Sequence, residues 1–305
     1  MGVKKLKTFL SYKDQIALLK RKKLNIKDEA LAIATLKQTS YFALINGYKK
    51  IFKDKNGNYK PNTQFEHIVS LYNFDMQLSD LFFKYILIFE RQTKSHVSYH
   101  FSDKYRNAYH DYLNVASYDY TVEKKRMEIV RFINDLDHVL QKGKAPDYIK
   151  HYKKKHNGEI PLWVLVKAMT LGQISKMYSL FEQPLQDDIS SEYGLTNSQL
   201  ESVLEFLTYF RNVCAHNERI YNYHTRQEIP LALITKLNIS PSNPQRNNLF
   251  SVVVCLKHVL TTDKFAAFLS ELQQVINNLS LDGCPVTKNQ ILSDMGFDAD
   301  WDKYF

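Results

Sequence analysis

The sequence predicts an all-α protein built around a helical bundle. Only 9 glycines and 8 prolines interrupt its 305 residues, so turn signals are sparse and long stretches can remain helical. In most of these stretches apolar residues recur every three or four positions, which is the period of an amphipathic helix. We therefore expect a basic helical N-terminal region over residues 1–60, a helical core over 61–225 and a helical C-terminal extension over 226–305.

Three helices are expected in the N-terminal region. Ser11 and Asp14 resemble a capping box that opens a helix over Ser11–Lys23. A second helix is expected over Asp28–Lys37, and a third over the aromatic-rich segment TSYFALINGYKKIF. The run Lys20–Lys23 ends the first helix, where cations suit the helix dipole. The turn-forming segment KDKNGNYKPNTQ then separates this region from the core.

Two further capping boxes mark the long helices of the core. Thr63 and Glu66 predict the start of a long apolar helix that runs toward His100. Thr196 and Gln199 predict the start of a second apolar helix, which leads into the segment LTYFRNVCAHNERIYN.

Residues 101–160 are expected to form a basic connector inserted into the core. It contains a helix over Val122–Leu140 and a basic tract from Lys142 to His156. An apolar helix follows from Pro161 and is expected to break at Gly172 and resume to Phe181. In the C-terminal extension, RQEIPLALI is expected to be a strand or an extended loop, followed by two helices and the acidic tail DMGFDADWDKYF.

The bulk composition excludes several classes of protein. Cys214, Cys255 and Cys284 form no C-x-x-C pair and are odd in number, which argues against a disulfide scaffold and favours a reducing cytoplasm. No run approaches the roughly 18 apolar residues of a membrane span, and the first residues lack the apolar core of a signal peptide. We expect a cytoplasmic protein without a membrane partner.

The positive charge is concentrated in the N-terminal region. Residues 1–60 hold 15 Lys or Arg and 4 Asp or Glu, a balance of +11 in a chain whose net charge is +9. Such local imbalance suggests an anionic partner on one side of the molecule. A solvated, lysine-rich surface explains the same charge equally well.

One arginine lies where an apolar side chain is expected. On a helical wheel Arg211 shares a face with apolar residues such as Leu204 and Leu207. A guanidinium cannot lose its charge by a pKa shift, so its burial requires partners. Two interpretations stay open: an ion pair with a buried carboxylate, for which Glu90 is a candidate, or a phosphate-binding role.

The segment RNVCAHNERIYN resembles the R-N-x-x-A-H-x-x-R-x-x-N signature of the Abi family of phage abortive-infection proteins (the AbiD/AbiF group), within the HEPN superfamily of helical RNA-cleaving domains. The segment LYNFDMQLSDLFFKYILIFERQTKSHVSYHFS is similar to the first long helix of that family. PLWVLVKAMTLGQISKMYSLF and the N-terminal segments also resemble it. The long helix departs from the family pattern at Lys94, where arginine is usual, and Lys167 stands where an acidic residue is common.

The resemblance implies a HEPN-type bundle and a metal-independent endoribonuclease of anti-phage defence, with 2′,3′-cyclic phosphate and 5′-OH products. Arg211 would stabilise the phosphate, and His216 would act as general acid or base. Asn212 would orient the imidazole. Arg219 and Asn222 would support the site or contact RNA, unless they only cap the helix. Glu90 and Lys94 would form a helix-stabilising pair, or Glu90 would instead position Arg211.

Helix geometry suggests that two chains complete the site. Residues five apart on an ideal helix are about 140° out of phase, so Arg211 and His216 of one chain do not naturally converge. Either the helix breaks at Ala215, or two copies pool their residues, as HEPN nucleases do. We expect a homodimer with a composite site.

Cations interleaved with aromatic rings suit single-stranded RNA. The candidate RNA-binding residues are Lys4, Lys5, Lys20, Arg21, Lys22, Lys23, Tyr41, Tyr48, Lys49, Lys50, Tyr152, Lys153, Lys154 and Lys155. RNA is expected as substrate and, following the family resemblance, as a small noncoding regulator bound by the basic N-terminal region; DNA is not expected. No cofactor is expected.

Two further interpretations were weighed. His96 and His100 have the helical spacing of metal ligands, but the sequence shows no third ligand, so no metal is expected. The alternative function is a non-catalytic RNA-binding protein in which Arg211 and His216 hold RNA or the dimer.

Overall fold

The structure is a computed structural model, and it describes residues 8–106, 111–141, 145–239 and 245–305. Its described residues are mostly helical and contain no strand; two isolated bridges join Asn25 to Gln64 and Lys53 to Tyr59. The all-α prediction is confirmed. The expected residues Lys4, Lys5 and Lys142 lie outside the described part.

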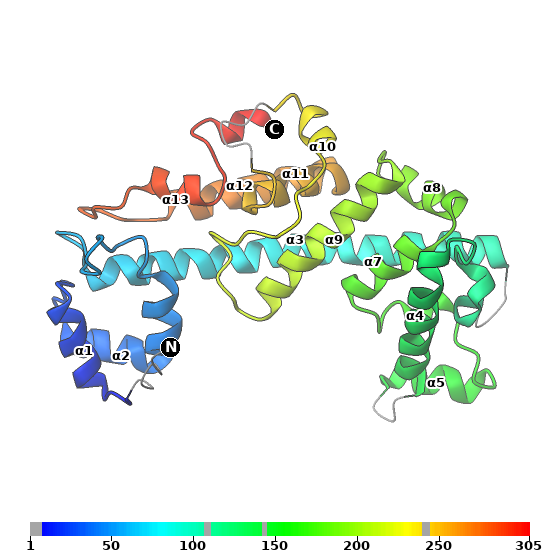
Figure 1. Cartoon of the computed structure of the whole chain (residues 1–305), viewed down its shortest axis with the longest axis horizontal. Coiled ribbons are helices and arrows are strands. Elements are labelled where there is room, and N and C mark those ends of the chain that lie inside the picture. Colours follow the sequence, from blue (N-terminus) through cyan, green and yellow to red (C-terminus); the bar gives the residue numbers. More distant parts are fainter. Residues whose placement is uncertain (1–7, 107–110, 142–144, 240–244) are drawn as a thin grey trace.

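A single long helix, α3, organises the molecule. It spans Phe65–Tyr105 and crosses the middle of the view in Figure 1. Its predicted start is wrong by one residue: Gln64 is the N-cap, and His67 reaches back to the Gln64 amide. Thr63 is instead buried, and its carbonyl accepts the Asn25 amide at 3.0 Å, so its backbone is engaged with the N-terminal region.

The N-terminal region packs at the beginning of α3. It consists of α1 (Tyr12–Arg21), α2 (Glu29–Thr39) and a π-helical turn, η1 (Phe42–Asn46). Ser11 caps α1 by accepting the Asp14 amide, as predicted.

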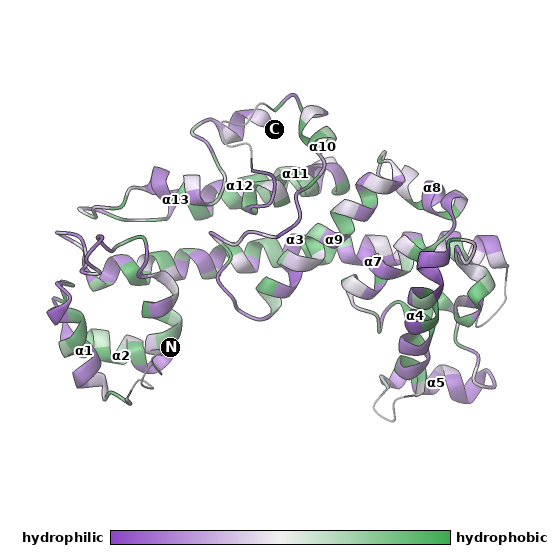
Figure 2. Ribbon diagram, in the orientation of Figure 1, coloured by the Kyte–Doolittle hydropathy of each residue, from purple (hydrophilic) through white to green (hydrophobic). Residues whose placement is uncertain are grey.

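The connector lies toward the other end of α3. Two short 3-10 turns, η2 (Asp111–Leu113) and η3 (Val115–Ser117), precede α4 (Glu123–Gln141) and α5 (Asp147–Lys155). Figure 2 shows that the ribbon of both helices is largely hydrophilic, in keeping with a solvated basic insertion.

Four helices then return along the core. They are α6 (Leu162–Leu165), α7 (Leu171–Leu180), α8 (Gln183–Ser191) and α9 (Asn197–Ala215). The predicted break at Gly172 is wrong: the helix is interrupted before Thr170, whose capping box with Gln173 starts α7. Gly172 lies in the first turn, where an added Cβ would approach the Thr208 methyl group to 3.3 Å, so this glycine allows α7 to approach α9 closely.

The C-terminal extension covers α3 and α9. RQEIPLALI contains no strand: residues 226–230 form a loop, and Leu231–Thr235 forms the short helix α10 after Pro230. The next helices are α11 (Leu249–Val259) and α12 (Thr262–Asn277), as expected, but a third helix, α13 (Lys288–Asp294), and the 3-10 turn η4 (Trp301–Tyr304) were not predicted.

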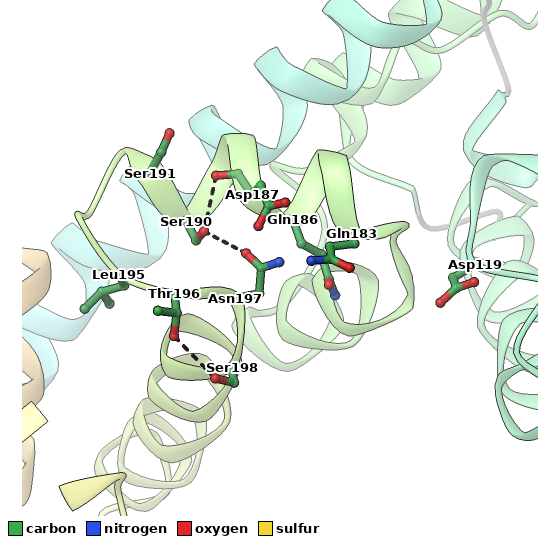
Figure 3. A pocket seen from close by; sticks show the side chains of 10 residues that line it. All are labelled: Asp119, Gln183, Gln186, Asp187, Ser190, Ser191, Leu195, Thr196, Asn197 and Ser198. Carbon is green, nitrogen blue, oxygen red and sulfur yellow. Dashed lines mark hydrogen bonds between the residues drawn. The ribbon is translucent and has the colours of Figure 1, made fainter. Parts of the chain in front are cut away.

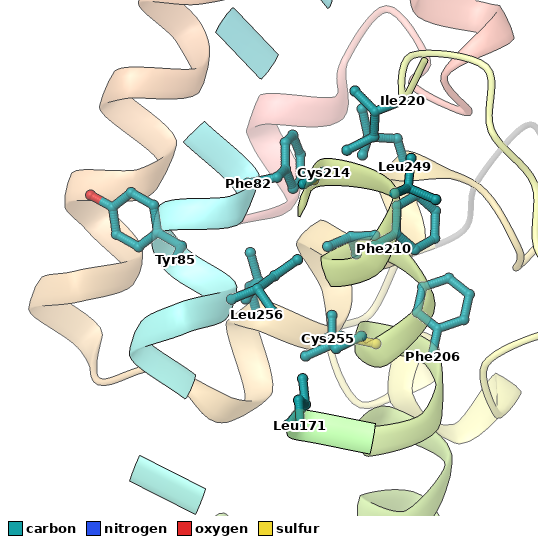
Figure 4. Packing of buried hydrophobic residues seen from close by; sticks show 14 of the residues in the cluster. Phe82, Tyr85, Leu171, Phe206, Phe210, Cys214, Ile220, Leu249, Cys255 and Leu256 are labelled. Carbon is teal, nitrogen blue, oxygen red and sulfur yellow. The ribbon is translucent and has the colours of Figure 1, made fainter. Parts of the chain in front are cut away.

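The hydrophobic core lies where α3, α7, α9, α11 and α12 meet. Figure 4 shows Phe82 of α3, Phe206 and Phe210 of α9 and Leu256 of α11 in one cluster. Nearly every side chain of α11 is buried, and burial of apolar surface on this scale is what fixes α9 against α3. No helix among the described residues is both long enough and apolar enough to cross a bilayer.

Candidate functional site

The segment singled out in the sequence lies at the C-terminal end of α9. The predicted capping box of Thr196 and Gln199 starts this helix. The helix ends at Ala215, and His216 is its C-cap, with its backbone N–H donating to the Asn212 carbonyl at 3.1 Å. Asn217 then adopts a left-handed conformation with φ +51°, which turns the chain away. The helix therefore ends at Ala215, but Arg211 lies inside it and the His216 amide still makes the helical hydrogen bond to Asn212, so this end does not by itself bring the two side chains together.

His216 and Asn212 are both exposed to solvent. Within the part of the chain that the structure describes, no hydrogen bond joins their side chains, so the orienting role expected of Asn212 stays a prediction. The imidazole of His216 is accessible at the end of a rigid, well-packed helix.

Arg211 is fixed by a buried carboxylate. Its Nε lies 3.4 Å from Oε2 of Glu90, and its guanidinium lies over the Phe83 ring at 5.7 Å. The other carboxylate oxygen of Glu90 accepts Lys94 Nζ at 2.7 Å. Both contacts considered for Glu90 are therefore confirmed: it pairs with Lys94 on its own helix and with Arg211 on α9.

This pairing leaves part of the guanidinium available. The Arg211 side chain is 24 % exposed, whereas the Glu90 side chain is 7 % exposed. No described residue accepts a hydrogen bond from the two Nη groups. One carboxylate also faces two cations, so the cluster of three carries a net positive charge. It is a fixed, partly exposed cationic cluster at the edge of the core.

A second buried carboxylate, Asp75 of α3, holds the loop that follows His216. Asp75 accepts the Tyr221 amide at 2.6 Å, the Ile220 amide at 3.2 Å and the Tyr48 hydroxyl at 2.5 Å. Burial raises the pKa of Asp75 to about 6, against the opposing effect of these hydrogen bonds. Three segments far apart in sequence are thereby joined at one side chain.

This arrangement corrects one predicted RNA contact. Tyr48 is 4 % exposed, and its ring packs between Tyr72 and Tyr221. Burial, more than the neighbouring Asp75 carboxylate, raises the pKa of its hydroxyl far above the ordinary value. Tyr48 is therefore part of the core and cannot stack on a base.

The tail of the segment is attached to the N-terminal region. Arg219 donates a hydrogen bond to the Gly47 carbonyl and lies over the Tyr221 ring at 5.8 Å. Its Nε and the Oδ1 of Asn222 are buried without a hydrogen-bond partner among the described residues. Arg219 supports the loop, as one of its two expected roles, while two polar atoms beside it remain unsatisfied.

An open groove of about 780 Å³ adjoins this loop. Its walls come from η1, the start of α3 and the segment after His216, and they include Phe42, Asn46, Tyr72, Asn217, Arg219 and Asn222. Phe42 is 78 % exposed. The groove therefore combines an exposed ring with amide and guanidinium groups immediately beyond His216.

Comparison with known families identifies the chain. The family described as Abi-like protein matches residues 34–222, from within α2 to Asn222. The chain belongs to this family. The match covers α3, α9, Glu90, Arg211 and His216, and membership supports a role in abortive infection. No curated protein and no solved structure matches the chain.

The exposed cations of the Abi-like protein differ in their freedom to bind RNA. Arg21, Lys23 and Lys50 are exposed, whereas Lys20 pairs with Glu29. Lys22, Lys49 and Tyr41 are partly buried and line a cavity of about 480 Å³. Lys49 also donates to the Asn46 side chain. Lys22, Tyr41 and Lys49 thus lie around one cavity, and the binding of RNA by any of these residues stays a prediction.

The second basic tract of the Abi-like protein lies on α5. Lys154 and Lys155 are exposed, whereas Lys153 donates to the Leu140 carbonyl and so ties α5 to α4. Tyr152 is half-buried and stacks on His156 at 5.0 Å. This helix therefore presents fewer free cations than its sequence suggests.

Two other places in the Abi-like protein could hold a ligand. Figure 3 shows an open hollow of about 630 Å³ between α8 and the start of α9, lined by Asp187, Ser190, Asn197 and other polar groups. Its acidic side chains disfavour RNA.

His96, His100 and Glu192 form a second cluster. Burial lowers the pKa of His96, and the neighbouring Glu192 carboxylate opposes that shift. The sequence alone did not reveal Glu192, because it lies 92 residues from His100.

Proposed function

We propose that this Abi-like protein is a metal-independent HEPN endoribonuclease that acts in abortive infection, with Arg211 and His216 at the reacting phosphodiester. The observation that supports this most is how the Arg211 guanidinium is held. Glu90 holds its Nε side and leaves both Nη groups without a partner among the described residues, at the end of a helix that also presents an exposed His216. A fixed, partly exposed guanidinium is suited to a phosphate.

The proposed reaction needs no group beyond RNA and the two side chains. The ribose 2′-OH loses its proton to a base and attacks the adjacent phosphorus, and the P–O bond to the next nucleotide breaks. The leaving 5′ oxygen takes up a proton, so the products are a 2′,3′-cyclic phosphate and a 5′-OH. His216 serves in proton transfer, and Arg211 stabilises the charge that develops on the phosphate oxygens.

The site is proposed to form between two copies of the chain. His216 is at the C-cap of α9, while Arg211 is held back toward α3 by Glu90. The exposed Asn212 and Tyr209 lie on the solvent side of the same helix end. A twofold arrangement of these helix ends would bring the Arg211 of one protomer toward the His216 of its partner.

The groove beyond His216 is proposed to receive the RNA strand next to the cleaved bond. Its exposed Phe42 offers a surface for base stacking, and the exposed Asn217 offers a side-chain amide for hydrogen bonding. The exposed Arg21, Lys23 and Lys50 then extend a cationic surface on which a small regulatory RNA would bind.

Cleavage is tested with labelled single-stranded RNA in EDTA. The wild type should produce cyclic-phosphate ends, and Arg211→Ala and His216→Ala should abolish them while retaining most RNA affinity. Arg131→Ala and His138→Ala are matched controls, because both residues are exposed on α4 and far along the chain from the site. The same RNA with a 2′-deoxy sugar at the cleaved position should bind without being cut. Equal behaviour of all five proteins would remove the proposal.

The composite arrangement has its own test. Arg211→Ala and His216→Ala proteins are mixed, allowed to exchange subunits and assayed together. If the two residues act across the interface, mixed dimers carry one intact site and activity reappears in about half of the dimers. Activity that stays absent, although mass measurement shows mixed dimers, would contradict the shared site and leave a site within one chain.

The regulatory surface is tested by charge reversal at Arg21, Lys23 and Lys50. Each lost phosphate contact should lower the slope of log affinity against log salt by about 1. Reversal at Lys264 and Lys288 in the C-terminal extension is the control, since neither belongs to the proposed surface. An unchanged salt slope would make the N-terminal charge a solvated surface only.

The alternative function is RNA binding without cleavage. The Glu90–Arg211 ion pair favours it, because the pair alone explains a guanidinium on an apolar helix face. Under this alternative Arg211→Ala lowers the stability of the fold, and the wild type binds RNA without producing cyclic-phosphate ends.

A further inference from the structure

Three potential metal ligands meet near the C-terminal end of α3, the end away from the N-terminal region. His96 and His100 lie one helical turn apart on α3, and Glu192 is the C-cap of α8. Glu192 Oε1 lies 2.9 Å from His100 Nε2, and Oε2 lies 3.4 Å from His96 Nδ1. One ligand atom of each residue lies within 4.8 Å of the other two.

We propose that His96, His100 and Glu192 bind a divalent transition metal of the Zn²⁺ class. Imidazole and carboxylate are common zinc ligands, with bonds of about 2.0–2.2 Å that place neighbouring ligand atoms of a tetrahedron about 3.3 Å apart. The two contacts, at 2.9 Å and 3.4 Å, are close to that edge although they end on the two different oxygens of Glu192, and one ligand atom of each residue lies within 4.8 Å of the others. Two imidazoles favour Zn²⁺ and its neighbours over Mg²⁺ or Ca²⁺, which prefer oxygen ligands.

The fold holds these ligands in place before any metal binds. Tyr193, directly after Glu192, packs on the His96 ring at 5.3 Å and on the Phe89 ring at 5.7 Å. Its hydroxyl lies 2.9 Å from Thr93 Oγ1. The backbone next to Glu192 is thus attached to the same helix that carries both histidines, so little ordering is needed on binding.

The charge of the cluster suits a cation. Glu192 has no lysine or arginine partner among the described residues; its ion-pair contacts are the two histidines. Side-chain exposures of 26 % for His96, 18 % for His100 and 39 % for Glu192 leave a path for a hydrated ion and room for a water as fourth ligand.

Binding would cross-link α3 to the junction of α8 and α9. The site lies about 9 Å of helix rise beyond Glu90 and uses neither Arg211 nor His216. Its role is therefore structural reinforcement of the core, and it does not rest on the proposed nuclease activity.

The full-length protein is stripped with a chelator, dialysed and titrated with Zn²⁺ against a chromophoric competitor. We expect one equivalent bound at micromolar or tighter affinity and a rise in Tm on addition of Zn²⁺. Co²⁺ substitution should give the intense visible absorption of a tetrahedral site. Glu192→Gln, His96→Ala and His100→Ala should each lower the affinity by more than the roughly 10–100-fold that follows loss of a residue that only orients a ligand.

The matched controls are His151→Ala and His156→Ala, exposed histidines of α5 that should leave Zn²⁺ binding unchanged. The glutamine of Glu192→Gln has nearly the same shape as glutamate and can still hydrogen-bond both imidazoles, but it lacks the carboxylate charge. This variant therefore tests metal binding while keeping the local contacts. Circular dichroism verifies its fold. A wild type that binds no Zn²⁺ at micromolar concentration would overturn the proposal. So would a Zn²⁺ affinity shared by the wild type and all three ligand variants.

Discussion

Replacing Asp75 by alanine should loosen the loop that follows His216 more than any surface change can. The wild-type carboxylate accepts the Ile220 and Tyr221 amides and the Tyr48 hydroxyl inside the core. Asp75→Ala removes the carboxylate that accepts all three hydrogen bonds and leaves three buried donors. Each such donor costs about 1–3 kcal/mol when it loses its partner, or about 6 kcal/mol for the three.

Part of this loss is offset, because the variant no longer buries a charge. Burial raises the pKa of Asp75 from 3.8 to about 6, which at neutral pH corresponds to about 3 kcal/mol of penalty in the folded state. The net loss in the free energy of unfolding is therefore about 3 kcal/mol, a large share of the 5–15 kcal/mol typical of a folded protein.

Urea unfolding at pH 7, followed by far-UV circular dichroism, measures the difference. Asp80→Ala is the matched control, because Asp80 is an exposed carboxylate on the same helix and should change stability by less than about 0.5 kcal/mol. Hydrogen exchange supplies the local readout: the Ile220 and Tyr221 amides should lose protection first. If Asp75→Ala unfolds at the wild-type midpoint with both amides still protected, the carboxylate does not hold this loop.

Three other predictions concern stability. The folded pKa of Asp75 lies above its unfolded value, so its contribution to the free energy of unfolding is fully present below about pH 3.8 and is lost as pH rises through about 6. The urea midpoint of the wild type should therefore fall over this pH range, and that of Asp75→Asn should not. An equal fall in both proteins would assign it to other groups. Gly296→Ala should lower the free energy of unfolding by several kcal/mol, since its Cβ would lie 2.1 Å from Asn248 Nδ2 at φ +87°. Gly283→Ala is the control: its φ is +70° and the space around it is open, so it should lose about 1 kcal/mol. Similar Tm values for the two variants would refute the clash. Thr196→Ala should cost about 1 kcal/mol by removing the cap of α9, and an unchanged Tm would show that the capping box is dispensable.

Local sequence patterns predicted the helices of the core well. The capping box at Thr196 gave the start of α9, and the apolar stripe around Arg211 gave its buried face. The Glu90–Arg211 pair was also anticipated, because a guanidinium on an apolar face requires a carboxylate. These features depend on residues a few positions apart or on a strong energetic demand, and both can be recognised in a sequence.

Features that depend on long-range contacts were missed. Nothing near Asp75 indicates that it accepts amides 145 and 146 residues away. Tyr48 resembled an RNA-stacking residue because it precedes two lysines, yet its ring is enclosed by Tyr72 and Tyr221. Aromatic residues beside lysines have the same local pattern whether the ring is buried or exposed, so tertiary packing decides their role.

The length of α3 has a mechanical consequence. Its 41 residues form one continuous helix, about 60 Å long at 1.5 Å per residue. A rigid lever of that length converts a tilt of about 5° at one end into a displacement of about 5 Å at the other. The basic N-terminal region packs on one end and the connector lies at the other, so a small angular adjustment of the helix at one end becomes a large displacement at the opposite end.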